Sequence, residues 1–423
     1  MANVSNLAAK QERLAPKNIC RFCQGHLSQT LCDLGMSPPS NRYLREDQLK
    51  DMEPFYPLHA YVCDKCFLVQ LEQFHTAEEI FAHDYAYFSS YSSSWMAHCQ
   101  RYCEQMQKQY GIGKSSLVIE IASNDGYLLQ NFVKAGIPAL GIEPAANVAK
   151  VAIEKCVPTR VEFFGVACAK KLVAEGRQAD LLLGNNVLAH VPDLNDFVLG
   201  LKILLAPKGV ITFEFPHLLK LMEENQFDTI YHEHFCYFSL LAISKVFAHH
   251  GLTIFDVEEL PTHGGSLRIH ACHQGHRTLT DGYQDVLKKE LTFGLDQIST
   301  YEKFAQQVRV TKQKLLEFLI EAKQQGKKIA GYGAAAKGNT LLNYCGIRGD
   351  FLDYVVDLNP HKQNMFLPGT HIPIYAPEKI KETKPDYVLI LPWNIRDEVA
   401  NTHAYIKEWG GKFVVPIPTV KVL

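Results

Sequence analysis

The sequence predicts an α/β protein in three parts: an N-terminal metal-binding domain, a central doubly wound domain and a smaller α/β domain at the C-terminus. Two C-x-x-C pairs lie within the first 75 or so residues. Strand-like and helical stretches alternate between residues 115 and 273, and the alternation resumes between residues 328 and 418. Such alternation predicts a mostly parallel sheet, and 423 residues suffice for two or three hydrophobic cores.

The composition is typical of a soluble globular protein. Hydrophobic residues make up 47% of the chain and charged residues 21%. We find no apolar run long enough to span a membrane and no apolar signal-peptide core, so we expect no membrane association and a cytoplasmic location. The net charge of −2 and the pI near 6.8 argue against a nucleic-acid-binding protein. The sequence leaves the oligomeric state open, and we favour a monomer.

Four of the twelve cysteines form two closely spaced pairs. Cys20 and Cys23 make one C-x-x-C knuckle, and Cys63 and Cys66 make the other. A two-residue spacer lets both thiolates of a knuckle reach one ion, and four thiolates close a tetrahedral site that has no position for a substrate. We therefore predict a structural Zn²⁺ site. The alternative is a redox-active pair, and the other cysteines are expected to be buried thiols.

The central part is predicted to contain seven strands, with helices between the first five. The last two are joined only by the short turn at residues 261–265 and are expected to form a hairpin. An antiparallel final strand is typical of the methyltransferase form of this fold, whereas a dehydrogenase sheet ends parallel. The seven strands are expected at residues 117–122, 139–143, 161–164, 180–185, 210–215, 253–260 and 266–272.

A polar helical stretch at residues 281–326 is expected to connect the central part to the smaller α/β domain. The strands of that domain are expected at residues 328–334, 353–359, 386–392 and 412–418.

The first central strand ends in a turn that suits a cationic cofactor. Glu120 is followed by Ser123, Asn124 and Gly126, and small residues at a strand end let a ligand approach the backbone closely. There is no G-x-G-x-x-G motif, and the carboxylate would repel a pyrophosphate. S-adenosylmethionine instead carries a sulfonium and an α-ammonium group, which carboxylates attract. Glu143, which ends the next strand, is placed to accept hydrogen bonds from both ribose hydroxyls.

Asn185, Asn186 and His190 follow the fourth strand and complete the predicted S-adenosylmethionine site. They belong to the same carboxyl edge of the sheet, where ligands bind in open α/β folds. The alternative is an α/β domain without a cofactor, in which these polar residues are incidental.

The segment at residues 227–239 is dense in groups that hold or move protons, among them Tyr231, Glu233 and His234. Transfer of a methyl group to carbon requires a carbanion equivalent, which proton abstraction beside a ketone provides. A histidine is a suitable base, a carboxylate can orient it, and tyrosine hydroxyls can hold the oxyanion. The segment therefore predicts acid–base catalysis. A structural polar turn is the alternative, and no further ligands with suitable spacing support a metal there.

Seven motifs in order give the chain an end-to-end resemblance to the three-domain sugar C-methyltransferases of deoxysugar biosynthesis. Those enzymes act at C-3 of nucleotide-linked 4-keto-6-deoxyhexoses. The motifs are LGMSPPSNRYL (34–44), CDKCFLVQ (63–70), YAYFSSYSSSW (85–95), EIASNDGYLL (120–129), YHEHFCYFS (231–239), HGGSLR (263–268) and GYGAAAKGNTLL (331–342).

The resemblance implies a role for each site. The four paired cysteines are the zinc ligands, His234 is the base for the C-3 proton beside Tyr231 and Glu233, and Tyr85 lies near the sugar. S-adenosylhomocysteine and a branched sugar are the products. The nucleotide of the substrate, with thymidine or guanosine as its base, is expected to contact Lys337, Asn339, Thr340, Asn394 and Arg396. A Gly-rich strand-to-helix turn followed by lysine suits a phosphate.

The resulting division is a zinc-binding domain at residues 1–76, a class I S-adenosylmethionine-dependent methyltransferase domain at 77–300, and a smaller Rossmann-like domain for the nucleotide sugar at 301–423. Three rival functions remain. A methyltransferase acting on oxygen or nitrogen would not need the Tyr-Glu-His cluster. An NAD-dependent sugar-nucleotide oxidoreductase lacks its glycine motif here, and a zinc-ribbon module for nucleic acid lacks the basic surface.

Overall fold

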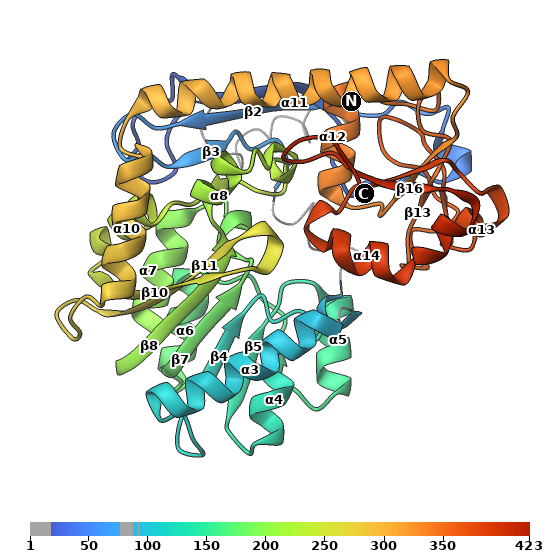
Figure 1. Ribbon diagram of the computed structural model, residues 1–423. Helices are drawn as coiled ribbons and strands as arrows, with labels where there is room; N and C mark the ends of the chain where they lie inside the picture. Colours follow the sequence, from blue (N-terminus) through green and yellow to red (C-terminus); the bar gives the residue numbers. More distant parts are fainter. Residues whose placement is uncertain (1–17, 77–87, 92) are drawn as a thin grey trace, which may run out of the picture. The chain divides into compact units, whose positions relative to one another are not determined.

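The computed structural model describes residues 18–76, 88–91 and 93–423 (Figure 1). These residues form two compact units that interleave along the sequence. The described residues of the first unit fall within Met1–Leu27, Cys63–His217 and Phe235–Asp296, and those of the second within Ser28–Val62, Leu218–His234 and Gln297–Leu423. Among the described residues, no helix is long and apolar enough to cross a membrane. The boundaries predicted at residues 76 and 300 stay predictions.

The first unit is built on a seven-stranded sheet with the order β10-β11-β8-β7-β4-β5-β6. The strands from β4 to β8 run parallel, and β11 runs antiparallel between β8 and β10. The predicted terminal hairpin is thus confirmed. The strands are β4 (Val118–Ile121), β5 (Ala139–Ile142), β6 (Thr159–Arg160), β7 (Ala179–Asn185), β8 (Leu205–Pro216), β10 (Leu252–Leu260) and β11 (Ser266–His273).

Helices cover both faces of this sheet, with α3 and α4 in front and α6 and α7 behind in Figure 1. Tyr102 and Met106 of α3 and Phe132 of α4 pack on Leu181 and Leu183 of β7 in one buried cluster. The helices are α3 (Ser93–Tyr110), α4 (Leu129–Lys134), α5 (Ala146–Glu154), α6 (Val166–Ala174), α7 (Leu194–Leu204), α9 (Leu240–His249) and α10 (Asp281–Phe293).

The third predicted strand is wrong in its position. Residues 161–164 were expected to be extended, but β6 covers only Thr159–Arg160 and pairs with β5 there. Val161 is 50% exposed and Phe163 is 38% exposed, while Glu162 pairs with Lys171 at the surface. An apolar run predicts a strand only when the run is buried, and this one is not.

The helical stretch predicted at 281–326 is two helices. Gly294 ends α10 in the left-handed conformation, with φ of 93°, and α11 (Ile298–Gln324) then begins in the second unit. Glycine adopts this conformation without the steric cost of a side chain, so it is the usual residue after the end of a helix.

The second unit contains a six-stranded sheet with the order β14-β13-β12-β15-β16-β17, parallel except for β17. An antiparallel pair, β1 (Gln29–Ser37) and β2 (Tyr56–Val62), belongs to the same unit, and β1 contacts α11. The other elements are α8 (Leu218–Glu223), β12 (Ile329–Tyr332), α12 (Ala336–Cys345), β13 (Val355–Val356), β14 (Ile374–Tyr375), α13 (Lys379–Thr383), β15 (Tyr387–Ile390), α14 (Arg396–Thr402), β16 (Lys412–Val415) and β17 (Lys421–Val422).

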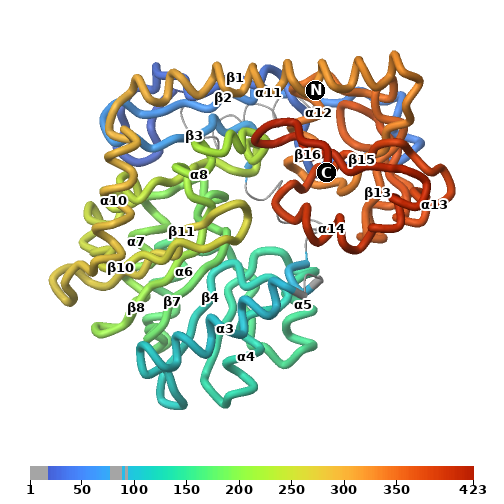
Figure 2. The backbone as a smooth tube through the Cα atoms, viewed as in Figure 1, coloured from blue at the N-terminus to red at the C-terminus, as the bar shows by residue number. Residues whose placement is uncertain are grey.

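The chain leaves the first unit after His217 and returns to it at Phe235, and the path can be followed through α8 in Figure 2. Buried Glu290 of α10 ties the two ends of this detour together. Its carboxylate lies 2.7 Å from His217 Nε2 and accepts the backbone N–H groups of Leu240 and Leu241 at 2.6 and 2.8 Å. A carboxylate at the start of α9 is also favoured by the helix dipole.

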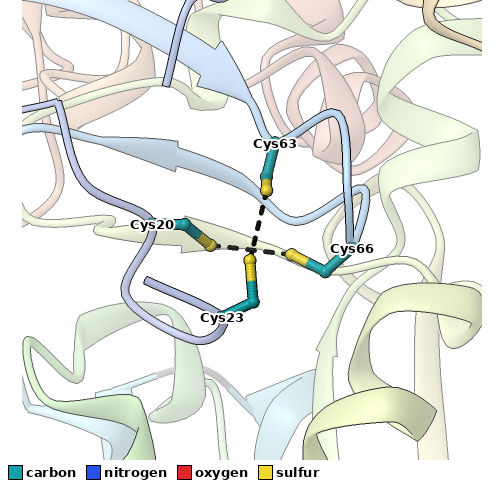
Figure 3. Close-up of side chains that lie close together, drawn as sticks. All are labelled: Cys20, Cys23, Cys63 and Cys66. Carbon is teal, nitrogen blue, oxygen red and sulfur yellow. Dashed lines mark hydrogen bonds between the residues drawn. The ribbon is translucent and has the colours of Figure 1, made fainter. Parts of the chain in front are cut away.

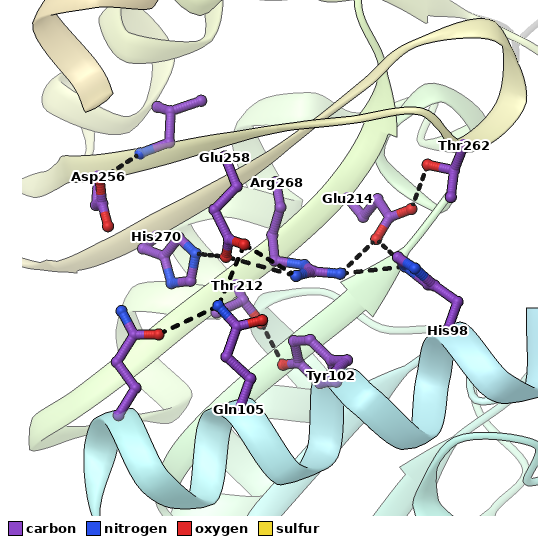
Figure 4. Close-up of polar contacts among 12 residues, drawn as sticks. His98, Tyr102, Gln105, Thr212, Glu214, Asp256, Glu258, Thr262, Arg268 and His270 are labelled. Carbon is purple, nitrogen blue, oxygen red and sulfur yellow. Dashed lines mark hydrogen bonds and ion pairs between the residues drawn. The ribbon is translucent and has the colours of Figure 1, made fainter.

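A buried network of charges joins α3 to β8 and to the hairpin β10–β11 (Figure 4). Arg268, which is 3% exposed, donates to Glu214 at 2.9 Å and to Glu258 at 3.4 Å. His98 lies 2.8 Å from the same Glu214 oxygen, and His270 lies 2.7 Å from Glu258. Burial alone would raise the pKa of Glu258, but the hydrogen bond from His270 and the charge of Arg268 lower that pKa to about 2.

We predict that Arg268→Met lowers the free energy of unfolding by about 3 to 5 kcal/mol, because it leaves the fully buried carboxylate of Glu214 and the partly buried one of Glu258 without their counter-charge. Chemical denaturation of the zinc-loaded protein measures this change. Arg177→Met is the control, since the Arg177 side chain is 50% exposed and its loss should cost less than about 1 kcal/mol. Equal losses in the two variants would contradict the prediction.

Candidate active site

The four paired cysteines come together within the first unit (Figure 3). Their Sγ atoms all lie within 4.8 Å of one another, and the Cys20–Cys66 and Cys23–Cys63 separations are 3.6 and 3.4 Å. A tetrahedral site with Zn–S bonds of about 2.3 Å needs sulfur atoms about 3.8 Å apart. The donor set and the spacing therefore fit zinc, and the predicted ligand set is confirmed as one cluster.

The carboxyl end of β4 carries the residues predicted to hold the methyl donor. Ala122, Asn124 and Gly126 all have positive φ, so the chain turns sharply there. A Cβ on Gly126 would lie 3.0 Å from Val157, so the turn packs too closely for a larger residue. Glu120 is fully buried, and burial raises its pKa well above the usual range.

Several buried polar atoms at this edge meet no hydrogen-bond partner among the described residues. They are both carboxylate oxygens of Glu120, Ser123 Oγ, Asp125 Oδ1 and Asn186 Oδ1. Buried polar groups are almost always satisfied in proteins, by protein, water or ligand. Buried donors and acceptors that lack a hydrogen-bond partner beside a sharp turn fit a polar ligand such as S-adenosylmethionine.

Glu143 at the end of β5 is already engaged with the backbone. Its two oxygens accept the N–H groups of Asn124 and Ala145 at 2.9 and 2.8 Å. Each carboxylate oxygen has a second lone pair, so the ribose contacts predicted for Glu143 stay a prediction. The two bonds mean that Glu143 also holds the turn after β4 in place.

Asn185 ends β7, and Asn186 follows it with φ of 56° and its N–H bonded to the Glu214 carbonyl at 2.7 Å. His190 lies in the short helix η3 (Leu188–His190). These residues and the turn after β4 share one edge of the first unit's sheet, because β4 and β7 are neighbouring parallel strands. The eight residues predicted to bind the cofactor are thus gathered in one unit.

Three of the four predicted catalytic residues, Tyr231, Glu233 and His234, lie on the detour and belong to the second unit. His234 Nδ1 lies 3.0 Å from the carbonyl oxygen of Thr229, and the rings of Tyr231 and His234 are 4.0 Å apart between centroids. A carbonyl oxygen can only accept, so Nδ1 carries the proton and Nε2 the basic lone pair in the neutral ring. Tyr85, the fourth predicted catalytic residue, lies outside the described residues.

Glu233 is buried beside a donor that sequence reasoning missed. Asn41 Nδ2 lies 2.8 Å from both carboxylate oxygens, 192 positions away in the chain. Burial raises the pKa of Glu233 to about 7, against the smaller lowering effect of Asn41. A carboxyl group that titrates near neutral pH is suited to proton transfer or to orienting a neighbouring base.

The predicted substrate residues surround a topological switch point in the second sheet. β13 lies on one side of β12 and β15 on the other, and ligands of such sheets bind where these paths diverge. Lys337 and Asn339 are in the first turns of α12, after β12, and Asn394 follows β15. The close approach of the two loops requires glycine at Gly333, because a Cβ there would lie 2.5 Å from Pro392.

Lys337 Nζ donates to Asn394 Oδ1 at 2.8 Å and lies 4.8 Å from the centre of the Trp393 ring. Buried Asn339 meets no hydrogen-bond partner with either side-chain amide atom among the described residues. Thr340 is engaged instead, since its hydroxyl donates to the Ile230 carbonyl at 3.0 Å. Arg396 begins α14 at the surface and is not brought to Lys337 by any described contact.

Sequence reasoning also missed Asp228 and Trp393. Trp393 Nε1 donates to Asp228 Oδ2 at 2.8 Å, and burial raises the pKa of Asp228 to about 7. The pair joins the start of the catalytic segment to the loop after β15. Asn41 lies in the motif at residues 34–44, and Trp393 directly precedes the predicted substrate residue Asn394, but nothing in the sequence indicates that either pairs with an acid so far along the chain.

Three protein families match successive parts of the chain. Residues 20–81 match a zinc binding domain, 96–257 a methyltransferase domain, and 261–418 a C-methyltransferase C-terminal domain. The C-methyltransferase NovU of Streptomyces niveus is 33% identical over 414 residues, which cover 98% of each chain.

Solved structures match with low identity. Magnesium protoporphyrin IX methyltransferase from Synechocystis PCC 6803, with bound S-adenosylmethionine, is 14% identical over 42% of this chain and 79% of its own, with a TM-score of 0.33. The PH0226 protein from Pyrococcus horikoshii OT3 is 14% identical over 48% of this chain and 100% of its own, with a TM-score of 0.38.

The raised pKa of Glu233 gives a pH-dependent prediction. A carboxyl whose pKa is higher in the folded than in the unfolded state costs stability as pH rises from its unfolded pKa, near 4.5, through about 7. Glu233→Gln removes that cost. The free energy of unfolding of the variant relative to the wild type should therefore rise between pH 5.5 and 8, by about 1 to 3 kcal/mol.

The matched control is Glu382→Gln, in which the replaced side chain is 63% exposed. Its stability relative to the wild type should stay constant over the same pH range. A Glu233→Gln difference that is equally flat would show that the Glu233 carboxyl does not titrate in this window.

Proposed function

Because the chain belongs to the C-methyltransferase family, with a zinc-binding domain and S-adenosylmethionine as its methyl donor, we propose that it methylates C-3 of a nucleotide-linked 4-keto-6-deoxy sugar. The nucleotide is dTDP or GDP. We assign the donor to the edge of the first unit's sheet and the sugar nucleotide to the second unit, with His234 as the base that makes the acceptor carbon nucleophilic.

The observation that carries the proposal is the hydrogen bond between His234 Nδ1 and the Thr229 carbonyl. It fixes the tautomer in which Nε2 is the base, and a base is what a carbon acceptor needs and an oxygen or nitrogen acceptor often does not. Glu233, held by Asn41, is the adjacent carboxyl that can share or orient the proton. The Tyr231 hydroxyl is the candidate donor to the enediolate oxygen.

In the proposed reaction, His234 Nε2 removes the proton from C-3 beside the C-4 ketone, and the electron pair of the C–H bond becomes that of the enediolate. S-adenosylmethionine supplies a methyl group on a cationic sulfur. The enediolate carbon bonds to that methyl group while the C–S bond breaks toward sulfur, giving S-adenosylhomocysteine and the branched ketone. The imidazolium of His234 then returns its proton to water.

The binding of the nucleotide is supported by the charges and unmet groups around α12. Lys337, set at the N-terminal end of a ten-residue helix, is suited to a phosphate oxygen. The buried amide of Asn339 can both donate and accept, as the edge of a nucleobase or a ribose hydroxyl requires. A pyrophosphate fits this second unit better than the carboxylate-rich edge of the first.

The central test is exchange of the C-3 hydrogen with deuterated solvent in the presence of S-adenosylhomocysteine, which cannot donate a methyl group. A panel of dTDP- and GDP-linked 4-keto-6-deoxy sugars should include one whose C-3 hydrogen exchanges and which accepts labelled methyl from S-adenosylmethionine. His234→Asn should slow both processes by about 100-fold or more. Full activity without any exchange would contradict the role of His234 and favour an oxygen or nitrogen acceptor.

Lys337→Met should weaken binding of the sugar nucleotide by about tenfold or more, through loss of one charged phosphate contact. Calorimetry should give an unchanged dissociation constant for S-adenosylmethionine. Lys314→Met is the matched control, since the Lys314 side chain is 61% exposed on α11. Equal affinities in all three proteins would remove Lys337 from the substrate site.

A further inference from the structure

Arg21 lies between the first two zinc-ligand cysteines and is buried, with 8% of its surface exposed. Nη1 donates to the Pro192 carbonyl at 2.8 Å, and Nη2 donates to the Leu71 carbonyl at 3.0 Å. Its guanidinium also lies 4.9 Å from the centre of the Phe235 ring. A buried cation is costly unless its surroundings compensate it, so this placement needs a physical reason.

A zinc site formed by the four cysteines would supply negative charge close to Arg21 in the chain. Zn²⁺ with four thiolates carries an excess of about two negative charges, and Arg21 is the residue next to Cys20. The same arginine is held at its backbone, where its N–H donates to Gln70 Oε1 at 2.9 Å while Gln70 Nε2 lies 3.2 Å from Cys20 Sγ. Gln70 therefore links the backbone of Arg21 to the thiol of Cys20, while the Pro192 and Leu71 carbonyls set the direction of the Arg21 side chain.

The contacts of Arg21 end on two segments of the candidate active site. Pro192 lies two residues after η3, which ends at His190, and Phe235 is the residue that follows His234 in the chain. These two segments also bind each other, because the Phe235 N–H donates to the Ala189 carbonyl at 2.6 Å.

A second connection runs through the strands. The second knuckle leads directly into β3 (Val69–Leu71), which pairs antiparallel with β9 (Cys236–Tyr237), the strand that follows the catalytic segment. The Leu71 N–H donates to the Phe235 carbonyl at 3.0 Å, and the Leu71 carbonyl receives Arg21. Each knuckle is thus followed in the chain by residues that contact the region around Phe235. Cys20 is followed by Arg21, which contacts this region through its side chain, and Cys66 is followed by β3, which contacts it through its backbone.

We propose that Arg21 is a positioning residue, through which the zinc site fixes the return of the catalytic segment at Phe235 and the segment from η3, which carries His190, to Pro192. The zinc keeps its closed coordination and touches no substrate. Its effect on methyl transfer is exerted by holding one end of the segment that carries His234. This effect on the reaction rests on the proposed function, whereas the structural part does not.

The test compares Arg21→Lys with Lys245→Met. Lysine keeps the positive charge beside the thiolates but cannot donate to both carbonyls in the planar geometry of arginine. Lys245 is the matched control, because it also contacts the second knuckle: its Nζ lies 4.8 Å from the centre of the Phe67 ring and donates to the Cys66 carbonyl at 3.5 Å. No described contact joins Lys245 to Pro192, Leu71 or Phe235. Metal analysis of both variants should give one zinc per chain.

Amide hydrogen exchange gives a readout that does not depend on any substrate. In Arg21→Lys, peptides covering residues 187–192 and 235–240 should exchange about tenfold faster or more, while strands β4 and β7 keep their protection. Lys245→Met should leave all four regions unchanged. Arg21→Lys with full zinc and wild-type protection of both peptides would overturn the proposal.

Removal of zinc from the wild type covers the case in which Arg21→Lys fails to fold or to hold zinc. A thiolate-competing chelator should release the metal and deprotect the same two peptides before β4 and β7. Retained protection at residues 235–240 after complete zinc loss would equally overturn the proposal.

The catalytic arm is the solvent exchange of the substrate C-3 hydrogen, which Arg21→Lys should slow about tenfold or more at saturating substrate. A purely structural role would instead lower zinc content and thermal stability together, with similar effects in Lys245→Met. If hydrogen exchange changes as expected but no sugar nucleotide exchanges its C-3 hydrogen even in the wild type, the proposed function fails and the positioning role stands.

Discussion

The detour of the chain between His217 and Phe235 is the constraint on which the rest of the structure depends. A sheet of the methyltransferase type needs only a short connection from β8 to the next helix, but here the chain enters the second unit before α9 begins. Glu290 makes this possible by accepting hydrogen bonds at both ends of the detour, from His217 and from the start of α9. A buried carboxylate with three donors is well satisfied, so the ends are fixed while the segment between them takes its contacts from the second unit.

The buried polar groups differ in whether their hydrogen bonds are satisfied. Glu143 and Glu290 are buried carboxylates whose oxygens accept backbone N–H groups, and both hold turns or helix starts in place. The side-chain oxygens of Glu120 and the side-chain amide of Asn339 are as deeply buried but meet no hydrogen-bond partner of good geometry among the described residues. An unsatisfied buried group costs free energy. A ligand that formed hydrogen bonds with Glu120 in the first unit or with Asn339 in the second would remove that cost.

The parts of the fold that were predicted correctly are those with local signals. The parallel strands and the terminal hairpin follow from apolar runs and short turns, and the four cysteines follow from their spacing. The strand expected at 161–164 failed because an exposed apolar run has the same composition as a buried one. The pairing of Asn41 with Glu233, and of Trp393 with Asp228, was out of reach because each joins residues more than 160 positions apart. Both pairs form because the second unit is assembled from three separate stretches of the chain. A local sequence pattern cannot show which distant stretches come together.

The sequence predicts a purely structural zinc, because four thiolates leave no open coordination position for a substrate. That reasoning excludes chemistry at the metal, but it does not exclude an effect of the zinc site on the position of the catalytic segment. Glu290 holds the chain at His217 and at the start of α9, so without a contact at Phe235 the segment that carries His234 would keep more conformational freedom. Ordering the backbone of one residue costs about 1 to 2 kcal/mol. The second knuckle, through β3, and Arg21, through its two carbonyl contacts, remove that freedom beforehand at Phe235. A closed metal site is well suited to this task, since it is rigid, needs few residues, and attracts the buried cation that makes the contact.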